Sequence, residues 1–399
     1  MKIELNKNFA NLSENYLFSE IARRVNEVKN ESRGESGEKV FGDRIISLGI
    51  GDVSLPVPPS VAREMARASA EMGTASGFRG YGDTQGDPSL REAICRRYAE
   101  RGIHFCADEI FINDGAKCDL GNLNDVLGDN EALIIAPAYP VYLDASIISG
   151  RRVRFLEATR ENGFLPTPDG LDNLARVIYL CSPNNPTGAV FDRIGLQKWV
   201  DHALESGSLI IFDAAYESFI SSPELPHSIF ELDGAKGCAV EVCSFSKMAG
   251  FTGLRCGWTA LARENPLHAL WKRRQGAKFN GASYIAQRGA IAAIEGSGQR
   301  ECAQNIAYYM GNARILADFF KKKGIFFTGG VHAPYLWVEC PRSTSSWELF
   351  EIILSSARVV CTPGSGFGKG GEGFVRLSSF ATREDVNEAI LRLDRIPWR

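Results

Sequence analysis

Lys247 stands where an amine could take part in chemistry instead of facing solvent. It closes the apolar run AVEVCSFS (239–246), and the glycine-bearing segment AGFTG (249–253) follows it closely. A lysine at the end of a buried strand is desolvated, so its amine loses a proton more easily and becomes a nucleophile that can form a Schiff base. We therefore predict that Lys247 is a catalytic residue.

Pyridoxal phosphate is the natural companion of such a lysine, and its chemical demands can be matched along the chain. Its pyridine nitrogen needs a carboxylate, and Asp213 ends the apolar run LIIFD (209–213). Its phenolate oxygen needs neutral donors, for which Asn185 and Tyr216 are suitable. Its phosphate needs hydroxyl and guanidinium groups. Such groups stand close to Lys247: Ser244, Ser246 and Arg255.

Short apolar runs alternate with helical stretches from residue 45 onward, and the candidate residues stand at the ends of these runs. Uninterrupted apolar runs suit a sheet that is buried on both faces, and helices between them indicate parallel neighbours. Ligands of such sheets bind beyond the carboxyl ends of the strands. The predicted strands are IISLGIG (45–51), EIFIND (109–114), ALIIAP (132–137), VIYLCSP (177–183), LIIFDAAY (209–216), AVEVCSFS (239–246) and GWTAL (257–261).

The pattern predicts an α/β protein, with a large domain of mostly parallel sheet flanked by helices and a smaller α+β domain. We expect the large domain at 45–285 and the small domain at 286–399. Residues 1–44 would form an arm and a helix (Ser13–Lys29) that packs with the small domain, followed by an exposed loop at 30–39. A long helix is expected over Tyr284–Lys323. Strands are expected after it at 324–330, 333–340, 358–365 and 373–380.

Composition narrows the class of protein. The 399 residues carry 45 basic and 48 acidic side chains, a net charge of −3, which leaves no basic excess for binding nucleic acid. The ten cysteines form no C-x-x-C pair and no metal-like spacing with the five histidines. We therefore expect reduced thiols, no metal, and a cytoplasmic protein. No apolar stretch is long enough to cross a membrane.

Three motifs together resemble the class I/II aminotransferases, the fold-type-I family of pyridoxal-phosphate enzymes. They are NNPTG (184–188), DAAY (213–216) and SFSKMAGFTGLRCGW (244–258). The resemblance spans residues 45–380 and implies a homodimer with active sites at the subunit interface. More narrowly, several pieces resemble the branch that acts on diaminopimelate: NYLFSEIARRV (15–25), LGIGD (48–52), FRGYG (78–82), INDGAKCDL (112–120), APAYPVYLD (136–144) and KFNGAS (278–283).

The resemblance implies a role at the cofactor for each matching residue. Lys247 would hold the cofactor and carry the proton between it and the substrate α-carbon. Asp213 would pair with the pyridinium nitrogen, and Tyr139 would stack on the ring. The remaining cofactor residues would be Asn185 and Tyr216 at the phenolate oxygen, Ala116, Lys117, Ser244, Ser246 and Arg255 at the phosphate, and Tyr81 and Asn280 from the neighbouring subunit.

On the substrate side, the resemblance implies that Arg376 grips the α-carboxylate as a bidentate fork. Gly51 would let the backbone approach the bound amino acid closely. The other implied substrate contacts are Tyr16, Lys117, Tyr139, Asn185 and Asn280. The reaction would be a ping-pong exchange of an amino group between LL-2,6-diaminopimelate/tetrahydrodipicolinate and glutamate/2-oxoglutarate, a step of lysine biosynthesis.

One position departs from the family pattern. An acidic residue usually stands three positions after the tyrosine of RGYG and faces the distal ammonium, but here that position is Thr84 and the acid comes one residue earlier, at Asp83. Either Asp83 takes over, or recognition of the far end of the substrate is weaker. Two alternatives therefore stay open: an aspartate or aromatic aminotransferase or β-lyase with the same cofactor, and a cofactor-binding sensor without turnover.

Overall fold

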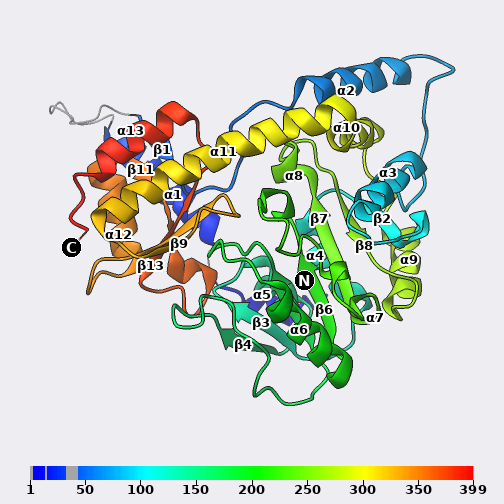
Figure 1. Cartoon of the computed structure of the whole chain (residues 1–399), viewed down its shortest axis with the longest axis horizontal. Coiled ribbons are helices and arrows are strands. Elements are labelled where there is room, and N and C mark those ends of the chain that lie inside the picture. Colours follow the sequence, from blue (N-terminus) through cyan, green and yellow to red (C-terminus); the bar gives the residue numbers. More distant parts are fainter. Residues whose placement is uncertain (1–2, 14–15, 33–43, 399) are drawn as a thin grey trace.

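The computed structural model describes residues 3–13, 16–32 and 44–398 (Figure 1). A seven-stranded sheet with its covering helices forms the larger part of the molecule, and a four-stranded sheet forms the smaller part. The predicted architecture, a large mostly parallel sheet flanked by helices with a smaller domain beside it, is confirmed.

The large sheet has the strand order β2-β8-β7-β6-β5-β3-β4. All neighbours run parallel except β8, which is antiparallel to both β2 and β7. Every residue of β3, β5 and β7 is buried, as expected for uninterrupted apolar strands covered on both faces. The strands are β2 (Ile110–Asn113), β3 (Ala132–Ala136), β4 (Val153–Glu157), β5 (Val177–Cys181), β6 (Leu209–Asp213), β7 (Ala239–Ser244) and β8 (Gly257–Ala260).

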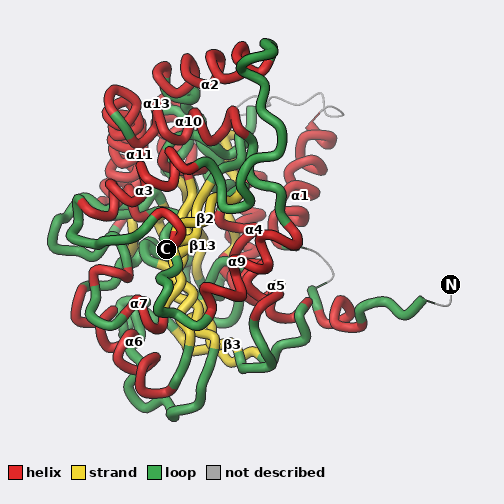
Figure 2. The backbone as a smooth tube through the Cα atoms, turned by 90° about the vertical axis from the view of Figure 1, so that its right-hand side faces the viewer, coloured by secondary structure: helices red, strands yellow, loops and turns green. Residues whose placement is uncertain are grey.

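Helices cover both faces of this sheet (Figures 1 and 2). Two hydrophobic clusters lie between the layers, one around Trp199 and Phe212 and the other around Trp271 and Ile211. The helices are α2 (Pro59–Met72), α3 (Pro88–Ala99), α4 (Ala116–Asn122), α5 (Val141–Ile148), α6 (Arg193–Ser206), α7 (Ala235–Cys238), α8 (Phe245–Met248), α9 (Leu267–Lys278) and α10 (Tyr284–Ile294). Short helical turns are η2 (Ala107–Glu109), η3 (Leu123–Val126), η4 (Glu217–Phe219) and η5 (Ile229–Glu231).

The small sheet is antiparallel, with the order β12-β13-β10-β9. Its strands are β9 (Phe327–Gly329), β10 (Tyr335–Glu339), β12 (Thr362–Pro363) and β13 (Phe374–Ser378). The expectation that the run at 45–51 joins the large sheet was wrong. Its strand β1 (Ile46–Ser47) pairs instead with β11 (Val359–Val360), which lies in the C-terminal part. The accompanying helices are α11 (Gly296–Lys323), α12 (Ser346–Ile352), η6 (Ile353–Ala357), η7 (Gly364–Phe367) and α13 (Arg383–Leu393).

The long helix expected over Tyr284–Lys323 is divided into α10 and α11. The break falls at Glu295, whose backbone is extended (φ −126°, ψ 150°), and at Gly296, which has a positive φ of 57°. Glycine adopts that conformation at little cost, so the chain changes direction here. The expected domain boundary at residue 285 falls inside α10, and α11 continues from there to the small sheet (Figure 1).

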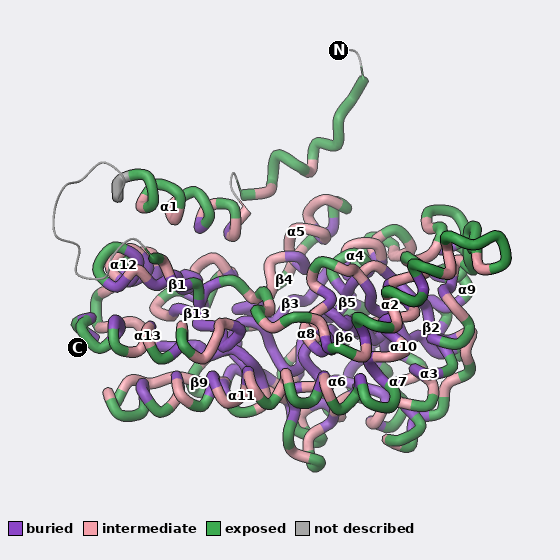
Figure 3. Tube along the Cα trace, turned by 90° about the horizontal axis from the view of Figure 1, so that it is seen from above, coloured by how far each residue is buried: buried purple, intermediate pink, exposed green. Residues whose placement is uncertain are grey.

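The N-terminal helix α1 (Leu17–Ser32) lies beside the C-terminal part of the chain (Figure 3). Arg24 forms an ion pair with Glu351 at 3.4 Å, and a side chain at Gly366 would overlap Leu17. Before it, the turn η1 (Lys7–Asn11) lies against the end of α5, where Asn8 donates to the Ile148 carbonyl at 3.2 Å, and the residues before η1 extend away from the body (Figures 2 and 3). The loop predicted at 30–39 lies mostly outside the described residues, and its first residues belong to α1.

Three expectations from composition can be compared with the structure. All ten cysteines are free thiols. Within the described ranges, no group of His, Cys, Asp and Glu side chains is arranged to hold a metal ion. None of the described helices combines the length and the apolar character that crossing a membrane requires.

Candidate active site

The polar residues at the strand ends line one cavity of about 360 Å³ between the large sheet and the small domain. The large domain supplies most of the wall, and Tyr335 and Arg376 come from the small sheet. Among the predicted site residues, the cavity is lined by Gly51, Ala116, Lys117, Tyr139, Asn185, Asp213, Tyr216, Ser244, Ser246, Lys247, Arg255 and Arg376.

Lys247 reaches this cavity from α8, the short helix that follows β7. Its amine donates a hydrogen bond to the carbonyl oxygen of Gly51. Burial lowers the pKa of Lys247 to about 8, and the nearby Arg376 and Arg255 guanidinium groups act in the same direction, while Asp52 opposes them. A large share of this amine is therefore neutral near pH 8, the form that a nucleophile requires.

Asp213 ends β6 and is buried in the floor of the cavity. Burial raises the pKa of Asp213, and two hydrogen bonds oppose this effect. The Tyr142 hydroxyl donates to Oδ2 at 2.6 Å, and the Ala215 amide donates to Oδ1 at 3.0 Å. Sequence reasoning missed Tyr142. Tyr139 stands before α5 and Tyr142 lies in its first turn, so no regular spacing in the sequence linked Tyr142 to the site.

Arg376 is a buried guanidinium whose contacts in the cavity wall are all neutral. Nη1 donates to Asn185 Oδ1 at 2.5 Å, and Nη2 donates to the Gly49 carbonyl at 2.6 Å. Within the described residues, no carboxylate forms an ion pair with Arg376, and its Nε has no hydrogen-bond partner. A buried cation without a counter-ion is costly, so this site favours an anionic ligand.

Aromatic rings surround these polar groups. The Tyr216 and Tyr335 hydroxyls share a hydrogen bond at 2.6 Å, and the Arg376 guanidinium lies 4.4 Å from the Tyr335 ring centroid. A side chain at Gly51 would overlap the Tyr335 hydroxyl, so the backbone here comes close to the cavity only because the residue is glycine. Tyr335 is a second cavity residue that the sequence did not reveal. The sequence of its strand, β10, does not indicate that this side chain faces the large domain.

A group of donors at one end of the cavity suits a phosphate. Ser244 Oγ donates to Ser246 Oγ at 2.9 Å, and Arg255 Nη1 donates to Ser246 Oγ at 3.3 Å. A side chain at Gly115, whose φ is +115°, would overlap the Arg255 guanidinium. These two hydroxyls and one guanidinium are the hydrogen-bonding groups that a phosphate dianion needs.

Three further predicted residues, Tyr16, Lys117 and Tyr139, lie close together where the N-terminal segment reaches the large domain. The Lys117 amine donates to the Tyr16 hydroxyl at 3.2 Å, which brings the residue preceding α1 to the start of α4. Burial raises the pKa of the Tyr139 hydroxyl well above its usual value, and the nearby Tyr16 adds to this effect. Tyr139 is therefore a neutral ring in the cavity wall, a surface on which a flat ligand can stack.

Tyr81 and Asn280 do not reach this cavity. Both are exposed, Tyr81 by 91% of its surface, and their segments lie side by side, since a side chain at Gly281 would come within 3.1 Å of the Asp83 carbonyl. Asp83 itself is engaged within the chain. Its Oδ2 pairs with Arg91 at 2.9 Å, and its Oδ1 accepts the Gln85 amide at 2.9 Å.

The cavity thus combines an amine of lowered pKa, a buried carboxylate, a phosphate-binding group and an uncompensated guanidinium, a set that fits pyridoxal phosphate and an amino acid. The model of the family "Aminotransferase class I and II" matches residues 43–393. The chain belongs to this family, whose members in general depend on pyridoxal phosphate.

Within the family, the similarity points to one activity. LL-diaminopimelate aminotransferase of Bacteroides fragilis is 45% identical, over 98% of this chain and 98% of that protein. The enzyme of the same name from Prochlorococcus marinus is 44% identical, over 99% of this chain and its own full length. The structure is similar to that of L,L-diaminopimelate aminotransferase from Chlamydomonas reinhardtii, with a TM-score of 0.91 and 40% identity, over 99% of this chain and 98% of that one.

Proposed function

We propose that this chain is an LL-diaminopimelate aminotransferase that uses pyridoxal 5'-phosphate to exchange an amino group between diaminopimelate/tetrahydrodipicolinate and glutamate/2-oxoglutarate. The observation that carries the proposal is the position of Lys247, Asp213 and Arg376 in one cavity. An amine, an anion and an anion-binding cation then stand around the space for a flat ring and an amino acid. The high similarity to enzymes of this name over nearly the whole chain favours this substrate over aspartate or aromatic amino acids.

Each side chain has a defined task in this reaction. Bound pyridoxal phosphate supplies an electron sink that stabilises negative charge at the substrate α-carbon. Asp213 would hold a proton on the ring nitrogen, and Tyr142, by its hydrogen bond, stabilises the ionised form of Asp213. Lys247, whose amine is partly neutral near pH 8, would be the base that takes up and gives back the α-proton. Arg376 would bind and orient the α-carboxylate in the cavity that Lys247 also lines.

The remaining cofactor contacts follow from the cavity wall. Asn185 and Tyr216 would donate to the ring oxygen, and Tyr139 would stack on the ring. Ser244, Ser246 and Arg255 would hold the phosphate together with the backbone at Ala116 and Lys117. Gly51, Tyr16 and Lys117 would border the substrate. Because one arginine binds the carboxylate that all these amino and keto acids share, the same cavity accepts both substrate pairs.

We further propose a homodimer in which Tyr81 and Asn280 complete the active site of the partner subunit. Their exposure at neighbouring surface positions, outside this chain's own cavity, supports this assignment. The apolar side chains of Ile3, Leu5 and Phe9 are also exposed on the N-terminal arm, where a second subunit would cover them. A dimer with ten free thiols suits the reducing cytoplasm, which we propose as its compartment.

The lowered pKa of Lys247 predicts how cofactor uptake depends on pH. Only the neutral amine attacks the cofactor aldehyde, and burial lowers the pKa of Lys247 to about 8. The rate of covalent pyridoxal-phosphate uptake by cofactor-free protein should therefore rise from pH 6.5 and level off above about pH 8, whereas an ordinary lysine would keep gaining reactivity up to its reference pKa of about 10.4. Stopped-flow absorbance measures this rate. A rise that continues to pH 10 would contradict the assignment.

A panel of single half-reactions tests the proposed substrate. LL-diaminopimelate and glutamate should each convert the bound cofactor to its amino form, seen as loss of its visible absorbance. Aspartate, phenylalanine and cystathionine should react much more slowly. Since Arg91 already compensates Asp83, we expect the distal ammonium to gain little from that carboxylate. Rapid reaction with aspartate and none with diaminopimelate would refute the substrate, and a colourless protein that takes up no cofactor would refute the whole proposal.

A further inference from the structure

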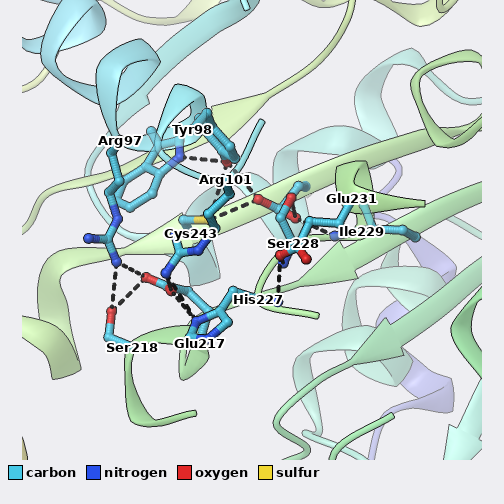
Figure 4. Close-up of polar contacts among 12 residues, drawn as sticks. Arg97, Tyr98, Arg101, Glu217, Ser218, His227, Ser228, Ile229, Glu231 and Cys243 are labelled. Carbon is cyan, nitrogen blue, oxygen red and sulfur yellow. Dashed lines mark hydrogen bonds and ion pairs between the residues drawn. The ribbon is translucent and has the colours of Figure 1, made fainter. Parts of the chain in front are cut away.

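Figure 4 shows a network of charged and polar groups, none of which lines the cavity. Its centre is Glu217, the residue directly after Tyr216, and each of its carboxylate oxygens faces an arginine. Arg97 donates to Oε1 at 2.6 Å, Arg101 lies 3.5 Å from Oε2, and His227 also lies 3.5 Å from Oε2. The Glu217 side chain is only 8% exposed, so water screens these charges little.

The turn that carries Glu217 also carries the active-site residues that follow β6. Ala215 and Tyr216 line the cavity, whereas Glu217 points to the opposite side, into the charged network. Tyr216 is the residue directly before the short turn η4, and Glu217 is the first residue of that turn. In so short a turn, a side chain fixed on one side limits the rotation of its neighbour on the other side.

Helix α3, which carries Arg97, also contacts the strand β7. Arg97 and Tyr98 are consecutive residues near the end of α3, and the Tyr98 hydroxyl donates to Glu241 on β7 at 2.6 Å. Tyr98 also lies 3.8 Å from the sulfur of Cys243, which precedes Ser244 in the phosphate-binding group. The network therefore connects α3 to the turn after β6, through Glu217, and to β7, through Glu241.

Glu217 keeps its negative charge, so its contacts with the arginines persist as the pH changes. Although burial alone would raise it, Arg97, His227 and Arg101 hold the pKa of Glu217 well below its usual range. Glu217 is therefore ionised at any pH at which the enzyme would work. Its ion pair with Arg97 does not open by titration, and the turn keeps one geometry.

We propose that Glu217 is a positioning residue: held by Arg97 and Arg101, it fixes the turn that presents the Tyr216 hydroxyl to the bound cofactor. The inference rests on the proposed function, because it assumes that Tyr216 donates to the ring oxygen of pyridoxal phosphate. It extends that function to residues that touch neither cofactor nor substrate.

A double-mutant cycle between Glu217→Gln and Tyr216→Phe tests this inference. The readouts are the pH midpoint of the absorbance change of bound pyridoxal phosphate and the dissociation constant of the cofactor. If Glu217 acts through Tyr216, E217Q should shift the midpoint in the same direction as Y216F and weaken cofactor binding about tenfold, the effect of one hydrogen bond. Adding E217Q to Y216F should then produce little further change. Effects that add in full, or an E217Q midpoint equal to that of the wild type, would overturn the inference.

Further variants separate positioning from loss of stability. Glu131→Gln serves as the matched control, because it removes a carboxylate that pairs with the buried Arg176 at 2.9 Å away from the cavity. It should leave the midpoint unchanged. If E217Q alone does not fold, the pair Arg97→Met/Glu217→Gln removes both charges of the closest ion pair, while the less buried Arg101 keeps its contact with His227 at 3.1 Å. This double variant must show the shifted midpoint, and Arg97→Lys must show a smaller shift.

A wild-type protein that takes up no cofactor would instead refute the proposed function.

Discussion

Replacing Lys247 by alanine is expected to abolish transamination and leave the protein folded. Proton transfer by a positioned side chain contributes about 100-fold to 10,000-fold to a rate, and Lys247 is also the amine that we propose to bind the cofactor. We therefore expect kcat to fall by at least about 10,000-fold. The substitution also removes an amine that is costly to bury, so the thermal unfolding temperature should change little. Half-reaction rates with glutamate, together with retention of cofactor after borohydride reduction, measure the two roles.

Lys236→Ala is the matched control for this variant. The Lys236 amine also donates to a backbone carbonyl, that of His104 at 2.6 Å, but it lies outside the cavity. The control should keep both activity and covalent cofactor. Steady-state turnover by the Lys247→Ala protein would show that another group carries the proton and would end the assignment of Lys247.

Much of the large domain could be predicted because its strands are apolar throughout. The runs that became β5, β6 and β7 are buried on both faces, so their composition alone identifies them. The edge strand β4 was missed, because Arg154 and Glu157 are exposed on it and interrupt the apolar pattern. The strand at 46–47 was assigned to the wrong sheet, because its partner β11 stands more than three hundred residues later in the chain.

Some residues of the candidate site could be predicted from their local sequence, whereas others depend on contacts between segments that are far apart in the chain. Residues at strand ends, such as Asp213 and Lys247, could be found because the sheet topology brings those ends together. Tyr142 and Tyr335 could not, since each acts through a contact with a residue far away in the sequence. The network around Glu217 was missed for a further reason. Charged residues usually lie in solvent, and no sequence pattern shows that Arg97 and Glu217 meet in the interior.

Replacing Arg376 by lysine should weaken both half-reactions by the same factor. Lysine keeps the positive charge but loses the planar fork that can hold a carboxylate through two hydrogen bonds. A hydrogen bond to a charged group contributes about 1.5–3 kcal/mol, so kcat/KM should fall by roughly 10-fold to 100-fold for each bond lost. The fall should be equal for diaminopimelate and glutamate, because the two amino acids share only the α-carboxylate end. Single-turnover half-reactions with each amino acid give the two values separately.

The structure supplies a control for the effect of burial. Arg176→Lys changes a guanidinium that is also buried, with a side chain 1% exposed, but that already pairs with Glu131 and Asp172 away from the cavity. It should lower stability without a selective effect on kcat/KM. A second control uses 1,5-diaminopentane, which lacks carboxylates, because the wild type and the Arg376→Lys variant should react with it equally slowly. If only one of the two amino acids lost reactivity in the Arg376→Lys protein, a single carboxylate site for both substrates would be excluded.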